Sequence, residues 1–133
     1  MSVKVLIIDD DEDDRELFSY ALSNVSSDVT CVEAVDGEDG LRLLRENGCN
    51  PDYIFLDLNM PRVDGILFLE KMRRDRRLSD IPVIIYTTSK FQNDKEKCVE
   101  LGAVHFITKP TTISEIESAI SFVLERKWEP IIH

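Results

Sequence analysis

Residues 53–61 read Tyr-Ile-Phe-Leu-Asp-Leu-Asn-Met-Pro, and this stretch decides the fold of the 133-residue chain. Its apolar start is typical of a buried strand. Pro61 ends that strand because proline cannot donate to a sheet ladder. Asp57 therefore lies where a buried strand stops. A carboxylate in that place is costly unless it is paired or bound to a metal, which makes Asp57 the first candidate for function.

Strand and helix patterns alternate on both sides of this stretch. Short β-branched or apolar runs predict further strands at 3–8, 28–34, 82–87 and 103–108. Apolar residues at three- and four-residue steps predict helices at 13–22 (continued to Val25), 37–46, 65–74 and from the Ser89–Gln92 capping pattern to Leu101. A last helix is expected from Thr112, with an apolar stripe that reaches Trp128.

Five strand–helix units in alternation predict an α/β fold with a parallel sheet covered on both faces. Right-handed crossovers limit this to a doubly wound, flavodoxin-like (βα)5 sandwich of three layers, with strand order 2-1-3-4-5. We expect one domain over residues 1–133, with a core from about 3 to 125 and a tail at 126–133. Ligands of such sheets bind at the carboxyl ends of the strands, beside the switch between strands 1 and 3.

The charge of the chain excludes several classes of partner. Its net charge is −10, which disfavours nucleic acid and anionic membrane surfaces. No apolar run approaches the ~20 residues of a membrane span, and the sequence begins without a signal peptide, so a cytoplasmic location is expected. Cys31, Cys49 and Cys98 have no metal-ligand spacing. The basic run at 73–77 is expected to be a solvated helix end.

The residues that follow the strands share one chemistry. Asp9, Asp10 and Asp11 follow the first strand, whereas Asp57 and Asn59 follow the third. Adjacent strands lie roughly 4.8 Å apart, so these acids are expected to meet and to repel one another. A hard divalent cation such as Mg²⁺ or Mn²⁺ resolves that repulsion, since it takes carboxylates and completes its shell with phosphate oxygens.

Two further strand ends supply groups that suit a phosphoryl anion. Thr87 ends the fourth strand and Lys109 follows the fifth, so a hydroxyl and an ammonium are expected beside the acids. No glycine-rich phosphate loop is present, which argues against a free nucleotide as the ligand.

These residues together resemble the receiver domain of two-component response regulators, over about the whole chain. The resemblance rests on 7–11 (Ile-Ile-Asp-Asp-Asp), on 56–61 with Asp64-Gly65, on Thr87 and on Lys109-Pro110. It implies a phosphoprotein of bacterial phosphorelay signalling. In such a protein Asp57 accepts a phosphoryl group from a phosphohistidine, in a reaction that depends on Mg²⁺. The opening at 12–15 is also similar to small receivers paired with phytochrome-like or hybrid kinases.

The resemblance also implies roles at the metal and phosphate. Asp10 and Asp57 would bind Mg²⁺ directly with the backbone carbonyl of Asn59, and Asp9 would act through water. Asp10 and Asp11 are the alternative acidic pair. Thr87 and Lys109 would contact the phosphate, and the bond to Pro110 would be cis.

The residues that would pass on the effect of phosphorylation, here called the readout residues, differ from those that are usual in the receiver family. Phe106 stands where tyrosine is usual, so a ring can swing but no hydroxyl reports to a partner; a plain core aromatic is the alternative. Thr88 stands where alanine or glycine is common. We predict that Thr88 crowds the path of water and slows hydrolysis of the aspartyl phosphate.

Output is expected to run through protein contacts or phosphorelay, because the chain leaves no room for an output domain. The expected partners are a sensor or hybrid histidine kinase, a histidine phosphotransfer protein and a downstream protein. A homodimer through the last helix, strand 5 and an exposed apolar tail of Trp128, Ile131 and Ile132 is a hypothesis.

The expected protein is thus a single-domain receiver similar to the chemotaxis regulators, and it is not a dedicated enzyme. Two other functions remain as alternatives. A phosphatase with an aspartyl-phosphate intermediate needs a second acid two residues past the nucleophile, and position 59 is Asn. A degenerate receiver that only docks partners would lack an acid or the lysine, and both are present.

Overall fold

The computed structural model describes residues 2–46, 49–60, 63–89, 92–126 and 128, so Pro61 and the end of the tail lie outside the described residues. The strands are β1 (Val3–Ile8), β2 (Val29–Ala34), β3 (Tyr53–Leu56), β4 (Val83–Thr87) and β5 (His105–Thr108). The helices are α1 (Glu12–Val25), α2 (Gly37–Arg45), α3 (Gly65–Arg74), α4 (Gln92–Glu100) and α5 (Ile113–Leu124). Each expected element is present, within a few residues of its predicted bounds.

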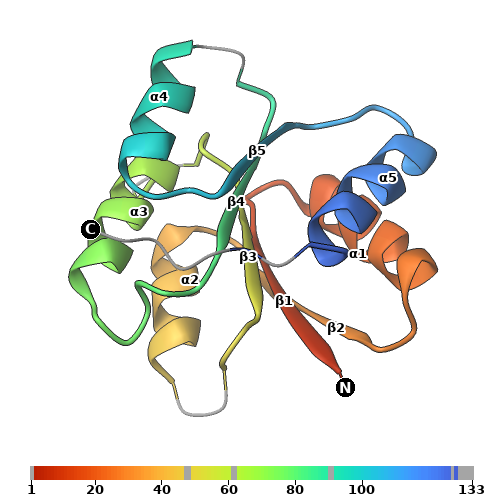
Figure 1. Ribbon diagram of the computed structural model, residues 1–133, viewed down its shortest axis with the longest axis horizontal. Helices are drawn as coiled ribbons and strands as arrows, with labels where there is room; N and C mark the ends of the chain where they lie inside the picture. Colours follow the sequence, from red (N-terminus) through yellow and green to blue (C-terminus); the bar gives the residue numbers. More distant parts are fainter. Residues whose placement is uncertain (1, 47–48, 61–62, 90–91, 127, 129–133) are drawn as a thin grey trace.

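The strands form one parallel sheet in the order β2-β1-β3-β4-β5, as predicted. Helices α1 and α5 cover one face, and α2, α3 and α4 cover the other (Figure 1). This is the flavodoxin-like, three-layer arrangement. Strands β1 and β3 lie side by side at the centre, so their carboxyl ends open at the same edge of the sheet.

Two apolar clusters lie between the sheet and the helices, one on each face of the sheet. Val5, Ile7 and Phe55 pack against α1 and α5, where Phe18 stacks near Phe55 with ring centroids 4.8 Å apart. On the other face Leu6, Ile8, Ile54 and Leu56 pack against α2 and α3. Because consecutive strand residues face opposite layers, β1 and β3 are apolar on both sides, and the backbone at their ends is held rigidly.

The last helix is shorter than its apolar stripe suggests. Helix α5 ends at Leu124, and Trp128 turns back so that its indole N–H donates to the carbonyl of Val123 at 3.1 Å. Trp128 is half-buried, with its ring 5.6 Å from that of His105. The prediction of an exposed Trp128 is therefore wrong, whereas Ile131 and Ile132 lie outside the described residues.

Arg73, at the end of α3, is not a solvated residue. Its guanidinium donates to the carbonyls of Leu101 at 2.5 Å, Gly102 at 3.0 Å and Ser79. Gly102 has φ 89°, a conformation that glycine adopts without strain, where α4 turns towards β5. Arg73 thus joins the α3–β4 loop to the end of α4, and the prediction of a solvated helix end is wrong at this residue.

None of the helices in the described part of the chain is long and apolar enough to span a membrane.

Candidate functional site

Acidic side chains meet at the carboxyl ends of β1 and β3. Asp57 N–H donates to the carbonyl of Ile8 at 3.0 Å, which sets the end of β3 beside the end of β1. The Asp9 side chain is fully buried, Asp57 is 5 % exposed, and Asp10 is exposed. Carboxylate oxygens of Asp9, Asp10 and Asp57 all lie within 4.8 Å of one another. The three acids predicted as metal ligands are therefore brought together.

Lys109 brings a buried positive charge to the same place. Its ammonium Nζ lies 2.7 Å from Asp9 Oδ2, 2.7 Å from Asp14 Oδ2 and 3.6 Å from Asp57 Oδ2. The backbone holds this end of β5, because Lys109 N–H donates to the carbonyl of Thr87 at 2.8 Å. The lysine predicted from sequence thus faces the acid predicted as phosphoacceptor.

The electrostatics of these groups follow from burial and from each other. Burial raises the pKa of Asp9 to about 6, although the positive charge of Lys109 opposes the rise. Burial alone would lower the pKa of Lys109, but the contacts with Asp14, Asp9 and Asp57 outweigh it and raise that pKa. The three acids favour the charged form of Lys109. Burial still disfavours the ionised form of Asp9, because Lys109 compensates for only part of that effect.

The residues present fit a hard divalent cation. Asp9 Oδ2 is a buried oxygen without an aligned hydrogen bond, so its 2.7 Å approach to Lys109 is a contact of charges alone. Such an atom has unused capacity to face a cation. The group offers carboxylate oxygens and a solvent-facing side in Asp10, which is the donor set that Mg²⁺ and Mn²⁺ prefer.

The loop after β3 keeps Asp57 in place. Asn59 is exposed, and its N–H donates to Asp57 Oδ1 at 3.4 Å. Gly65 begins α3 against the same backbone: a Cβ at this position would lie 2.6 Å from the carbonyl oxygen of Asp57 and 2.7 Å from the Cα of Leu58. Only glycine allows α3 to approach the site this closely.

The residues after β4 line another side of the site. Thr87 is fully buried, and its Oγ1 accepts the N–H of Ser89 at 3.3 Å. Thr88 is exposed. Ser89 Oγ donates to Asp94 Oδ2 at 2.7 Å, which ties the β4–α4 loop to α4. The sequence thus placed Thr87 at the strand end correctly.

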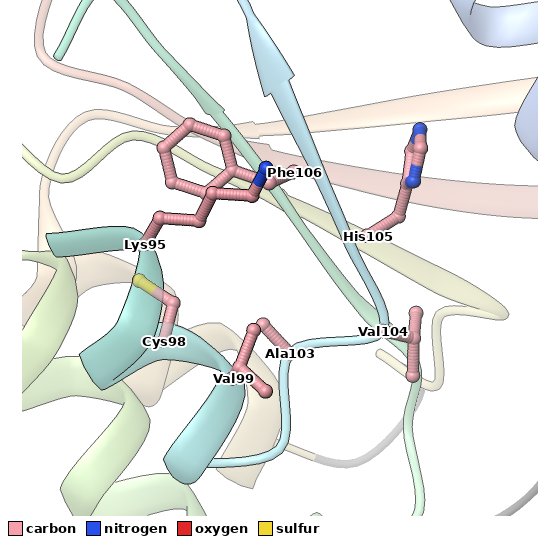
Figure 2. A pocket seen from close by; sticks show the side chains of 7 residues that line it. All are labelled: Lys95, Cys98, Val99, Ala103, Val104, His105 and Phe106. Atoms are coloured by element: carbon pink, nitrogen blue, oxygen red, sulfur yellow. The ribbon is translucent and has the colours of Figure 1, made fainter. Parts of the chain in front are cut away.

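Phe106 borders a hollow between α4 and β5. The hollow has a volume of about 260 Å³ and is lined by Lys95, Cys98 and Val99 of α4 and by residues 103–106. In Figure 2 the ring of Phe106 lies on the α4 side of β5 beside Lys95, and His105 points to the other side. Lys95 Nζ lies 6.0 Å from the centre of the Phe106 ring. Phe106 packs against the core in this position.

The bond before Pro110 differs from the prediction. The described part of the chain contains no cis peptide bond, so Lys109–Pro110 is trans and the predicted cis bond is wrong. Proline lowers the cost of the cis form, but trans stays favoured by about 0.5–1 kcal/mol for X–Pro bonds in general. The dipeptide alone is therefore too weak a basis for predicting cis.

Two site residues escaped the sequence reasoning. Asp14 was not among the residues predicted for the site, yet it pairs with Lys109. Arg15 donates from Nη1 to the carbonyl of Asp9 at 2.8 Å and from Nε to Glu33 at 3.2 Å. The sequence does contain one indication of this role. Helix α1 begins soon after the acidic end of β1, and Asp14 lies in its first turn.

Comparisons with known proteins point to one family. The profile described as the response regulator receiver domain matches residues 5–121. The chain is 37 % identical, over 92 % of its length, to the DNA-binding dual master transcriptional regulator RpaA of Synechocystis sp.. It is 34 % identical, over 80 % of its length, to the sensor histidine kinase CheAY of Helicobacter pylori. The chain covers 49 % of RpaA and 13 % of CheAY, so it spans half or less of these two relatives.

Solved structures agree with this match. The phosphorylated cyanobacterial phytochrome response regulator RcpA is 28 % identical with a TM-score of 0.88, over 96 % of this chain and 99 % of that one. The Mn²⁺-bound form of the response regulator Rcp1 is 28 % identical with a TM-score of 0.85, over 97 % and 99 %. Both resemble the present chain over almost their full length.

Proposed function

The chain belongs to the response regulator receiver domain family, and on that premise we propose that Asp57 accepts a phosphoryl group from a phosphohistidine of another protein. One observation carries the proposal. A nearly buried carboxylate ends β3 with an ammonium 3.6 Å away, beside two further acids in reach of one cation. Such a group is poised to be a nucleophile whose new negative charge is met by nearby positive charge.

The transfer makes one bond and breaks one. An oxygen of Asp57 attacks phosphorus, the bond from phosphorus to the imidazole nitrogen of the donor breaks, and the imidazole takes up a proton. Lys109 and the Thr87 hydroxyl face oxygens of the phosphoryl group, which carry most of the charge during transfer. Asp9, Asp10, Asp57 and the backbone carbonyl of Asn59 are the residues that would hold Mg²⁺ or Mn²⁺. When bound, that ion neutralises charge on the acids and on the phosphoryl oxygens.

The partners follow from the same chemistry. Receiver domains interact with histidine kinases and phosphotransfer proteins, and we propose such a protein as the donor. We also propose that residues 1–133 form one receiver domain, with its core at about 3–125. It would act in the cytoplasm, where a kinase makes phosphohistidine from ATP. The domain is a signalling switch, and its chemistry is limited to its own phosphorylation and dephosphorylation.

The readout would start at Thr87 and Phe106. A phosphoryl group on Asp57 offers the Thr87 hydroxyl a new acceptor, and a shift of Thr87 changes the packing that β4 offers to Phe106 on β5. Phe106 borders the 260 Å³ hollow on the α4 side, so its ring has space to move. A homodimer through α5, β5 and the tail is the proposed form in which this change is passed on, alongside contacts with a downstream protein.

One experiment tests the core of the proposal. The protein is incubated with Mg²⁺ and acetyl phosphate, and its intact mass is followed for a phosphoryl adduct that alkali removes. Asp57→Asn should take up no phosphoryl group. Asp13→Asn, which removes an exposed carboxylate nearby, should be modified like the wild type. A wild-type protein that gains no adduct, or an adduct that survives in Asp57→Asn, would contradict the proposal.

A further inference from the structure

Lys109 is shared among three carboxylates, and one of them has no place in the proposed chemistry. Asp9 and Asp57 belong to the metal and phosphoryl site. Asp14 comes from α1, and its Oδ2 lies as close to Lys109 Nζ as Asp9 does, at 2.7 Å. The oxygen of Asp57, at 3.6 Å, is the most distant of the three. The lysine is thus turned more towards its two neighbours than towards the phosphoacceptor.

We propose that Asp14 is a positioning residue that holds Lys109 and competes with the phosphoryl group on Asp57 for its charge. This inference rests on the proposed function. The ammonium of Lys109 donates a hydrogen bond to Asp14 Oδ2 at 2.7 Å, and Asp9 lies at the same distance as a second negative charge. A phosphoryl group on Asp57 adds a further negative charge near Lys109, so Asp14 and the phosphoryl group compete for the same cation.

The position of Asp14 is fixed by the start of α1. Asp11 caps this helix, and its side chain accepts the N–H of Asp14 at 3.1 Å. Arg15 anchors the same turn through its bond to the carbonyl of Asp9 at 2.8 Å. The backbone of Asp14 therefore stays in place if the lysine moves towards Asp57. A fixed competitor weakens the hold of Lys109 on the phosphoryl group.

The expected effect is modest, because the pair is partly exposed. The side chain of Asp14 is 32 % exposed and that of Lys109 is 8 % exposed. Ion pairs with one solvated partner are weak, so removing the charge of Asp14 should raise the affinity for a phosphoryl mimic by about threefold. Mg²⁺ must be saturating in this comparison, because a change in metal affinity would otherwise enter the measurement.

The test measures beryllofluoride affinity by calorimetry at saturating Mg²⁺ for Asp14→Asn, Asp14→Glu and Asp13→Asn. Asp13 lies one residue away, is exposed, and is not among the carboxylates within 4.0 Å of Lys109 Nζ. We expect tighter binding in Asp14→Asn, a return towards wild type in Asp14→Glu, and no change in Asp13→Asn. Equal gains in affinity in Asp14→Asn and Asp13→Asn would mean that the effect comes from the net charge of the protein alone. Weaker binding in Asp14→Asn would mean that Asp14 assists Lys109. Either result overturns the proposal.

A second measurement needs no phosphoryl mimic. The ammonium protons of Lys109 exchange with water slowly while carboxylates hold them, and NMR follows that exchange in the metal-free protein. Exchange should be faster in Asp14→Asn than in wild type and Asp14→Glu; equal rates overturn the claim that Asp14 holds the lysine. If wild type binds no beryllofluoride, the proposed function fails, and this measurement still decides whether Asp14 positions Lys109.

Discussion

The contacts of Arg73 allow the loss of stability in an Arg73 variant to be worked out. Its guanidinium joins three backbone carbonyls, those of Ser79, Leu101 and Gly102, which belong to the α3–β4 loop and to the turn after α4. Arg73→Met keeps the aliphatic stem and removes every donor. The change therefore isolates the hydrogen bonds from the packing of the side chain.

The expected loss of stability is about 3 kcal/mol. Hydrogen bonds to a charged group contribute roughly 1.5–3 kcal/mol each. Three bonds at the lower end of that range would give about 4.5 kcal/mol. Burial lowers the pKa of Arg73, and the cost of desolvating its guanidinium offsets part of that gain, which leaves about 3 kcal/mol. After truncation the half-buried carbonyls of Ser79 and Leu101 regain water, whereas Gly102 is buried and its carbonyl is left without a partner. In a chain of this length about 3 kcal/mol corresponds to a fall in melting temperature of roughly 10 °C.

Urea unfolding followed by circular dichroism measures the difference. Arg74→Met is the matched control, because Arg74 is the next residue of α3 and its side chain is exposed. Arg73→Lys should lie between wild type and Arg73→Met, since an ammonium keeps the charge but cannot reach three carbonyls in one plane. The reasoning would be refuted if Arg73→Met and Arg74→Met lost the same amount, or if Arg73→Met unfolded at the wild-type urea concentration.

Three further changes have definite expected outcomes. The pKa of Asp9 is raised from 3.8 to about 6, so its ionisation costs the metal-free protein stability as the pH rises through about 6. Mg²⁺ affinity by calorimetry should accordingly rise about tenfold per pH unit up to about pH 6 and then level off; a flat profile from pH 5 to 7 would contradict this. Gly65→Ala places a Cβ 2.6 Å from the carbonyl oxygen of Asp57, so it should lower the melting temperature and weaken Mg²⁺ binding together. An unchanged melting temperature in this variant would count against the close approach. Thr88→Ala should shorten the lifetime of the aspartyl phosphate, as followed by loss of the phosphoryl mass, and an equal or longer lifetime would show that Thr88 does not hinder water.

The fold was predictable because its signals are local and repeated. The apolar runs of β1, β3 and β4 lack alternation, and that pattern marks strands covered on both faces. The site followed from the topology, since Asp9 and Asp57 end adjacent parallel strands. Thr87 and Lys109 could be assigned in the same way, because Thr87 ends β4 and Lys109 directly follows β5.

Three of the misses share a physical cause, which is that a side chain's partner lies far along the chain or on the backbone. Arg73 contacts carbonyls 28 and 29 residues away, and a carbonyl has no signature in a sequence. Trp128 extends the apolar stripe of α5, yet its indole N–H bonds to Val123 after the helix has ended. Asp14 satisfies the rule for acidic residues in a first helical turn, so that rule hid its pair with Lys109.

The site has an excess of negative charge in the absence of a ligand. Asp9, Asp14 and Asp57 lie within 4.0 Å of a single ammonium, and Asp10 stands beside them, so negative charge exceeds positive charge before any ligand arrives. Asp9 and Asp57 lie close together because they directly follow the adjacent, paired strands β1 and β3. A phosphoryl mimic is itself an anion, and without a divalent cation it would meet a field that repels it. Beryllofluoride should therefore fail to bind in the presence of a chelator. The acids that repel the anion are the same ones that can hold the cation, so metal binding must come before phosphoryl binding.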